Sequence, residues 1–188
     1  MAEEFVEKEK LLLEVMREVE NCQRCHLYKK RKKVVFGNGN FDSKLMIIGE
    51  APGKEEDERG IPFVGRAGKL LRKVLKEAGL KEFYITNVVK CRPPDNRTPL
   101  KKEVESCLPF LERQIAILKP KIILVLGNTA LKSVTGENYK LANVRGKILE
   151  ISQKQILPSF HPSFAMRNKK AKKNLVEDIK KLGNYLKK

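Results

Sequence analysis

The chain has 188 residues, which suits one domain over residues 1–188, and its 41% of hydrophobic residues can form a sizeable core. Its 40 lysines and arginines outnumber 23 aspartates and glutamates, and the formal net charge of +17 favours nucleic acid over a membrane as the partner, although heat-tolerant proteins carry similar lysine-rich surfaces. The acidic start MAEEFVEKEK excludes a secretory signal peptide, and the longest apolar run, IILVL at 122–126, is far too short to cross a bilayer.

Helices and strands are predicted to alternate along the chain. Apolar residues at helical spacing predict helices at 4–19, 65–80, 99–118 (with Thr98 as the cap), 128–136 and 169–188. Short apolar runs predict strands at 44–50, 83–89, 121–127, 147–151 and 155–160. The central strands are almost continuously apolar, which is typical of a parallel sheet with helices on both faces. We therefore expect an α/β fold with a mainly parallel sheet of about four strands.

The residues that follow the predicted strands are the least ordinary in the chain. They read GEAPG, NVVKCRPP, GNTA and SFHPSF. In parallel sheets the ligand crevice lies beyond the carboxyl ends of the strands, so these segments are expected to share one rim. The first of them opens a loop with five carboxylates within nine residues, at 50 and 55–58, in a strongly basic chain. For Glu55, Asp57 and Glu58 we favour a solvated turn that balances nearby lysines and arginines.

Four cysteines suggest a metal centre. Cys22 and Cys25 form a C-x-x-C pair, whereas fifteen residues separate Cys91 from Cys107. Four thiolates at irregular spacing suit an iron–sulfur cluster. A structural zinc site and unmetallated cysteines are both open alternatives on spacing alone. Only two histidines are present: His26 lies beside the C-x-x-C pair and we assign it no role, and His161 lies on the predicted rim.

Several of these motifs together resemble one known family. GEAPGKEEDERGIPFVGRAG, NVVKCRPPDNRTP, HPSFAMRN and the four-cysteine pattern are similar to the iron–sulfur (family four) uracil-DNA glycosylases. The resemblance implies a three-layer α/β/α fold, a [4Fe–4S] cluster on the four cysteines, and hydrolysis of the bond between uracil and deoxyribose in DNA repair, which leaves an abasic site. A related iron–sulfur group has an apolar residue at the position of Glu50, so the glutamate favours the narrower uracil enzyme.

The resemblance also implies a role for five side chains. Breaking the glycosidic bond makes the sugar cationic and leaves negative charge on the base. Glu50 matches the position that stabilises the sugar or orients a water, and His161 matches the donor to the departing uracil. Phe63 would stack on the base, and Asn87 offers one donor and one acceptor to the edge of uracil. Glu56 matches a pocket position and is expected to help exclude the methyl group of thymine.

The sequence departs from the family pattern at one place, and the resemblance also implies the binding partners. Where family members often have leucines, this chain has Phe164, Ala165 and Met166, and we take Met166 and Arg167 as candidates for the side chain that wedges into the base stack. The expected partner is single- or double-stranded DNA that contains uracil, bound by a monomer in the cytoplasm of a prokaryotic cell, near the nucleoid, with a sliding clamp as a further candidate partner.

Two other functions compete with this one. A non-catalytic nucleic-acid-binding protein with a structural or redox cluster would explain the charge and the cysteines, but not the gathering of Glu50, Phe63, Asn87 and His161 on one rim. A phosphate loop at GEAPG is weak, because the segment matches neither a Walker A loop nor a dinucleotide fingerprint and its glutamate would repel phosphate.

Overall fold

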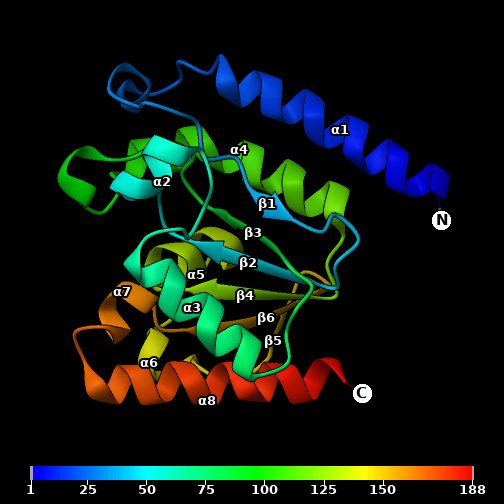
Figure 1. The fold of residues 1–188 in the computed structure, drawn as a ribbon, viewed down its shortest axis with the longest axis vertical. Coiled ribbons are helices and arrows are strands. Elements are labelled where there is room, and N and C mark those ends of the chain that lie inside the picture. Colours follow the sequence, from blue (N-terminus) through cyan, green and yellow to red (C-terminus); the bar gives the residue numbers. More distant parts are fainter. Residues whose placement is uncertain (1, 188) are drawn as a thin grey trace.

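The computed structural model of the protein describes residues 2–187, which form a six-stranded sheet with helices on both faces (Figure 1). The strand order is β1-β3-β2-β4-β6-β5, and the four central strands run parallel to one another. The strands are β1 Asn38–Gly39, β2 Leu45–Gly49, β3 Tyr84–Asn87, β4 Ile122–Leu126, β5 Leu149–Ile151 and β6 Lys154–Ser159. The expected α/β class and the four parallel strands are confirmed. The two edge strands, β1 and β5, are short and antiparallel, so the sheet is wider than the expected four strands.

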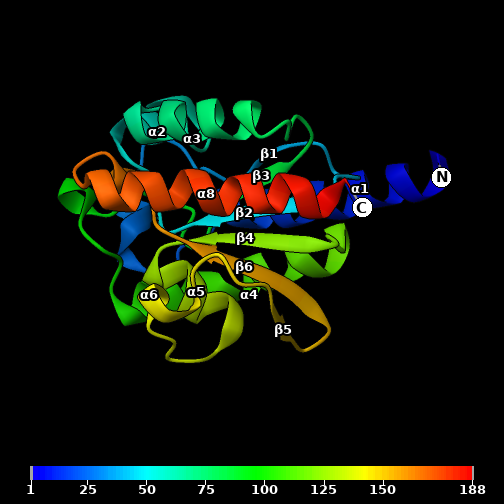
Figure 2. The same cartoon turned by 90° about the horizontal axis from the view of Figure 1, so that it is seen from below.

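Helices pack on both faces of the sheet and form two apolar cores. They are α1 Ala2–Glu20, α2 Lys54–Arg59, α3 Arg66–Glu77, α4 Lys101–Leu118, α5 Asn128–Thr135, α6 Leu141–Val144, α7 Pro162–Ala165 and α8 Lys169–Leu186, with 3-10 turns η1 His26–Lys29 and η2 Pro94–Asn96. Helices α3 and α8 cover one face, and α4 and α5 cover the other (Figure 2). Helix α1 packs outside α4 (Figure 1). None of the described helices is long and apolar enough to cross a membrane.

The start of α4 differs from the prediction. The helix begins at Lys101, after an extended Leu100, and Thr98 does not cap it. Instead the Glu103 carboxylate accepts hydrogen bonds from the Leu100 N–H (2.7 Å) and from the Arg97 guanidinium (2.7 and 2.9 Å). A carboxylate inside the first turn thus replaces the predicted threonine cap, because it satisfies a free backbone donor and an arginine at the same time.

The acidic segment after β2 is a helix and not the expected solvated turn. Residues Lys54–Arg59 form α2, and Asp57 is buried, where its carboxylate accepts the Lys32 N–H at 3.0 Å. The solvated-turn interpretation is therefore wrong for Asp57. Its carboxylate is buried, and a backbone N–H from another loop stabilises its negative charge. Glu58 is exposed and pairs with the side chain of Lys32 at 3.3 Å, as expected, but it lies in a helix and not in a turn.

Candidate active site

A pocket of about 1070 Å³ opens at the carboxyl ends of the parallel strands. Its walls come from the loops after β2, β3, β4 and β6, which are the segments that the sequence placed on one rim. The structure brings all five predicted site residues to this lining: Glu50, Glu56, Phe63, Asn87 and His161.

Asn87 provides a hydrogen-bond acceptor that is ready for a ligand. The residue ends β3, is 1% exposed, and its Oδ1 is the only buried side-chain oxygen or nitrogen in the described range that has no hydrogen-bond partner. A buried polar atom left unsatisfied costs about 1–3 kcal/mol, and a bound molecule with an N–H in this position would recover that energy. The amide therefore points to a ligand with a donor on its edge.

Phe63 reaches the pocket through a strained backbone. Its φ of 55° lies in the left-handed region, which side chains other than glycine rarely adopt. Arg72 holds this conformation by donating to the carbonyl oxygens of Phe63 (3.2 Å) and Pro62 (3.3 Å). The ring lies 6.0 Å from the imidazole of His161, centroid to centroid, and supplies an apolar face next to Asn87.

Gly49 is required for this arrangement. It ends β2 opposite Asn87 in the parallel register. A Cβ at this position would lie 2.4 Å from the ring of Phe63 and 2.5 Å from Oδ1 of Asn87. Any side chain here would push the aromatic ring or the amide out of the pocket.

Glu56 holds both ends of the loop that carries Phe63. Its Oε1 accepts the N–H groups of Val64 (2.9 Å) and Gly65 (2.8 Å), and its Oε2 accepts the Gly53 N–H at 3.1 Å. These three bonds to a carboxylate fix the loop on either side of the aromatic ring. The expected exclusion of a methyl group by Glu56 stays a prediction, and the contacts give this residue a second, structural task.

His161 is recessed in the pocket wall as a neutral imidazole. Loss of water around the ring lowers the pKa of His161 to about 4; Arg167 adds to this effect and the Glu56 carboxylate opposes it. The Ser163 N–H donates to Nδ1 at 3.2 Å, so Nδ1 carries no proton and the Nε2–H is free to donate. The residue is thus a neutral donor at physiological pH.

Glu50 is oriented by a residue that sequence reasoning did not assign. Thr129, in the first turn of α5, donates from Oγ1 to Oε2 of Glu50 at 2.5 Å. The only signal in the sequence was the position of GNTA after a predicted strand. The contact holds a partly exposed carboxylate at the edge of the pocket.

The four cysteines line a second, small hollow on the α4 side of the sheet. Cys22, Cys25, Cys91 and Cys107 are all free thiols, and burial raises the pKa of Cys25, of Cys91 and, to about 11, of Cys107. Two donors reach the sulfurs: the Arg31 guanidinium contacts Sγ of Cys91 at 3.4 Å, and the Lys90 N–H contacts Sγ of Cys107 at 3.3 Å. Within residues 2–187, no group of three or more His, Cys, Asp or Glu side chains has the spacing of a metal-ion site.

Comparison with known proteins identifies the family. The model of the uracil DNA glycosylase superfamily matches residues 36–183. The chain belongs to the uracil-DNA glycosylase superfamily. The type-4 uracil-DNA glycosylase of Thermotoga maritima is 43% identical over 187 residues, which are 96% of this chain and 97% of that protein. Those of Sulfurisphaera tokodaii (44% identical, 91% of this chain and 83% of the relative) and Archaeoglobus fulgidus (37%, 90% and 90%) are also similar, and the resemblance to family four is confirmed.

In this glycosylase the rim of the pocket carries an exposed aromatic side chain. Phe164 in α7 lines the pocket and is 43% exposed, and its ring lies 5.6 Å from that of Phe160. Of the two predicted wedge candidates, Arg167 lines the pocket, whereas Met166 is 40% exposed but lies outside the lining. The structure therefore adds Phe164 to the candidates.

The role of Glu56 in holding its loop can be tested by replacing one oxygen. Glu56→Gln puts an amide NH₂ against a backbone N–H, so we expect the free energy of unfolding to fall by about 1–2 kcal/mol. We also expect proteolysis within the loop at 53–65 to become faster. Chemical denaturation and limited proteolysis with mass spectrometry measure both effects. Glu58→Gln, in the exposed part of the same helix, is the matched control, and equal behaviour of the two variants would contradict the structural task of Glu56.

Proposed function

We propose that this chain is a uracil-DNA glycosylase that draws a uracil nucleotide into its pocket and hydrolyses the bond between the base and deoxyribose. The observation that carries the proposal is the buried Asn87 acceptor, placed beside an aromatic face and a neutral histidine donor. The names of the three relatives described above, each a type-4 uracil-DNA glycosylase, support it. A non-catalytic DNA-binding protein would have no need for an unsatisfied amide and a strained aromatic residue in one pocket.

Base recognition follows from the chemistry of an amide. Asn87 Oδ1 can accept the N3–H of uracil, and the NH₂ of the same amide can donate to O4. Cytosine presents the reverse pattern at these two positions and would leave the amide mispaired. Phe63 supplies the face on which the extruded base would stack, as enzymes that act on single bases require.

Bond cleavage uses the charges that develop as the base leaves. The C1′–N1 bond breaks and both electrons depart with uracil, so negative charge spreads to O4 and O2 while the sugar becomes cationic. With Asn87 at O4, the Nε2–H of His161 is the donor for O2. Glu50, aligned by Thr129, places negative charge near the sugar, can orient the water that adds to C1′ and can accept the proton that this water releases, while uracil leaves as its anion.

Basic side chains line the pocket itself and would bind phosphates. The exposed ones are Lys54, Arg66, Lys140 and Arg167. Such contacts position DNA without reading its sequence. Phe164 is the side chain that we propose to insert in the base stack. A monomeric state, a sliding-clamp partner and a location near the nucleoid stay predictions.

We further propose that Cys22, Cys25, Cys91 and Cys107 hold a [4Fe–4S] cluster. Four unbridged thiols from three separate segments face one hollow, and two N–H donors already reach the sulfurs, as is usual around cluster thiolates. The cluster would serve the structure by joining the loop before β1, the segment after β3 and α4.

The cofactor can be identified from protein purified without oxygen. We expect broad absorption near roughly 400 nm and about four irons per chain. Cys107→Ser should clearly lower the melting temperature and have a smaller effect on the rate of base release by the folded protein. Elemental analysis and absorption spectra measure both. His26→Ala, a change of a possible ligand next to Cys25, should leave the iron content unaltered. One zinc and no iron per chain would overturn the assignment.

His161 should act as a neutral donor. His161→Ala is expected to lower the single-turnover rate by about 10²–10³, with little change in DNA affinity, because its bond strengthens only as charge develops on the base. Since the neutral form persists down to about pH 4, the contribution of His161 should be constant from pH 5 to 8. His161→Gln keeps a neutral donor and should recover part of the rate. A contribution that declines as the pH rises from 5 to 8 would show that the imidazolium is the active form.

Asn87 provides the sharpest test of the activity itself. An oligonucleotide with a single uracil should acquire an alkali-labile abasic site with the wild-type protein, and a thymine oligonucleotide should not. Asn87→Asp replaces the donor to O4 by a carboxylate that can only accept, so we expect the rate of uracil release to fall by about 10²–10⁴ and slow release of cytosine to appear.

The control for this change is Asn96→Asp, which adds the same charge at an exposed position on the rim of the pocket. This variant should lose only the DNA affinity that one added negative charge removes. If a folded Asn87→Asp protein released uracil at the wild-type rate, Asn87 would have no role in reading the base.

A further inference from the structure

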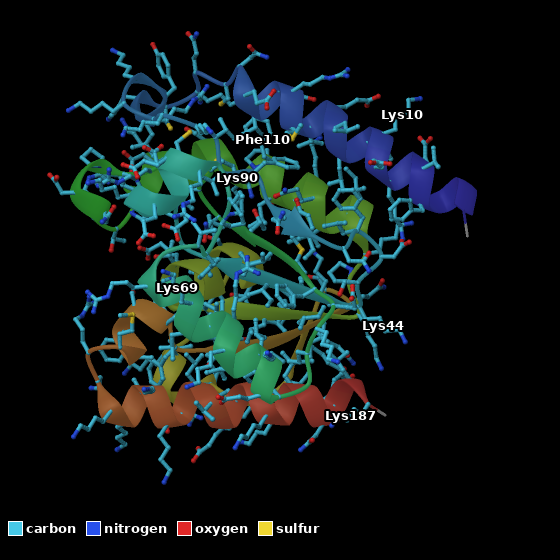
Figure 3. The ribbon with its side chains drawn as sticks, in the orientation of Figure 1. Lys10, Lys44, Lys69, Lys90, Phe110 and Lys187 are labelled. Carbon is cyan, nitrogen blue, oxygen red and sulfur yellow. The ribbon has the colours of Figure 1, made fainter. Side chains whose placement is uncertain are left out.

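Lys90 is a buried cation whose role is not explained by the reaction. Its side chain is fully buried on the α4 side of the sheet, where Figure 3 labels it near Phe110. The ammonium donates to Oγ1 of Thr86 (2.7 Å), to the carbonyl oxygen of Asn87 (2.7 Å) and to Oε1 of Gln114 (2.6 Å). None of the described carboxylates forms an ion pair with it. Burial lowers the pKa of Lys90 to about 7, although the nearby Cys107 opposes the shift.

The neighbours of Lys90 form a closed network. Gln114 donates from Nε2 to the Phe36 carbonyl and to the Tyr84 hydroxyl, both at 3.1 Å, and Thr86 donates to the same Phe36 carbonyl at 2.6 Å. The glutamine and threonine oxygens therefore face the ammonium with their own hydrogens already committed elsewhere. For stability alone, an apolar side chain of this volume would avoid the desolvation of a charge. The position thus calls for an explanation other than packing.

The two ends of Lys90 contact two different parts of the protein. Its side chain holds the carbonyl of Asn87, the residue whose amide faces the pocket. Its own N–H donates to Sγ of Cys107 in α4, and the next residue is Cys91. One residue therefore connects the backbone of the base-reading amide with the cysteine hollow.

We propose that Lys90 is a positioning residue for base recognition, which fixes the Asn87 peptide, and with it the direction of the Asn87 amide, relative to the cysteine-bearing helix. The proposal rests on the proposed function, in which Asn87 reads uracil. Without the ammonium, the buried Asn87 carbonyl loses this donor, and the peptide can turn toward another one. A small rotation at this peptide displaces the amide at the end of its side chain, and displacements of about 1 Å cost up to about 10²-fold in rate.

The test compares Lys90→Met with Tyr84→Phe in protein that carries its cofactor. Methionine keeps the length of the side chain without a donor, whereas Tyr84→Phe removes a hydroxyl from the far end of the same network and does not contact Asn87. We expect Lys90→Met to lower single-turnover uracil release by about 10–100-fold and to weaken inhibition by free uracil about tenfold. Tyr84→Phe should retain both wild-type values. A purely structural lysine would lower the melting temperature but leave the inhibition constant of the folded protein unchanged, and that result would overturn the proposal.

A second pair of variants applies if Lys90→Met does not fold. Thr86→Val removes one acceptor of the ammonium at nearly constant volume, and Thr86→Ser keeps it. Weaker uracil inhibition in the valine variant, restored by serine, supports the proposal, and equal inhibition in the two contradicts it. Failure of the proposed function can be told apart from failure of the role of Lys90. If the wild-type protein does not release uracil, both proposals are overturned. If the wild type is active, Asn87→Asp is defective and Lys90→Met is unaltered, only the role of Lys90 is overturned.

Discussion

The pocket depends on the parallel pairing of β2 with β3, which sets Gly49 opposite Asn87. In this register the last residue of β2 is a glycine, and it lies against the last residue of β3, the asparagine that carries the amide. The ring of Phe63 and the Asn87 oxygen can both approach only because Gly49 lacks a Cβ. All four residues of β3 are buried, and a shift of the register by one residue would exchange its two faces and remove the amide from the pocket. The segment after β4 adds Thr129, which holds Glu50, and the segment after β6 adds His161 to the pocket wall.

Three side chains of the pocket adopt costly states, and hydrogen bonds from neighbouring groups hold two of them. Asn87 leaves an oxygen unsatisfied, Phe63 adopts a left-handed backbone, and His161 gives up the water that would favour its charged form. Arg72 holds the backbone of Phe63 by donating to its carbonyl oxygen, and the Ser163 N–H holds the imidazole of His161 by donating to Nδ1. Such states persist where the surroundings determine them strongly, and they are typical of sites prepared for charge that develops during a reaction.

Local patterns in the sequence predicted the framework and the location of the site, but not the contacts across the chain. Continuous apolar runs identified the central strands, and the residues after them indicated the rim. The two-residue strand β1 has no apolar pattern because both of its residues are exposed. Helix α2 resembled a turn because its acidic residues are satisfied by distant groups, as Asp57 is by the Lys32 N–H. The contact of Thr129 with Glu50 and the burial of Lys90 likewise depend on residues that meet only in the fold.

The three hydrogen bonds of Glu56 have a consequence for how this protein can change over generations. The carboxylate that lines the pocket is also the clasp of the loop that carries Phe63. On our prediction that Glu56 also excludes larger bases, a mutation that removed this carboxylate would relax selectivity and loosen the loop at the same time. A change of selectivity through this position would therefore come with a loss of stability.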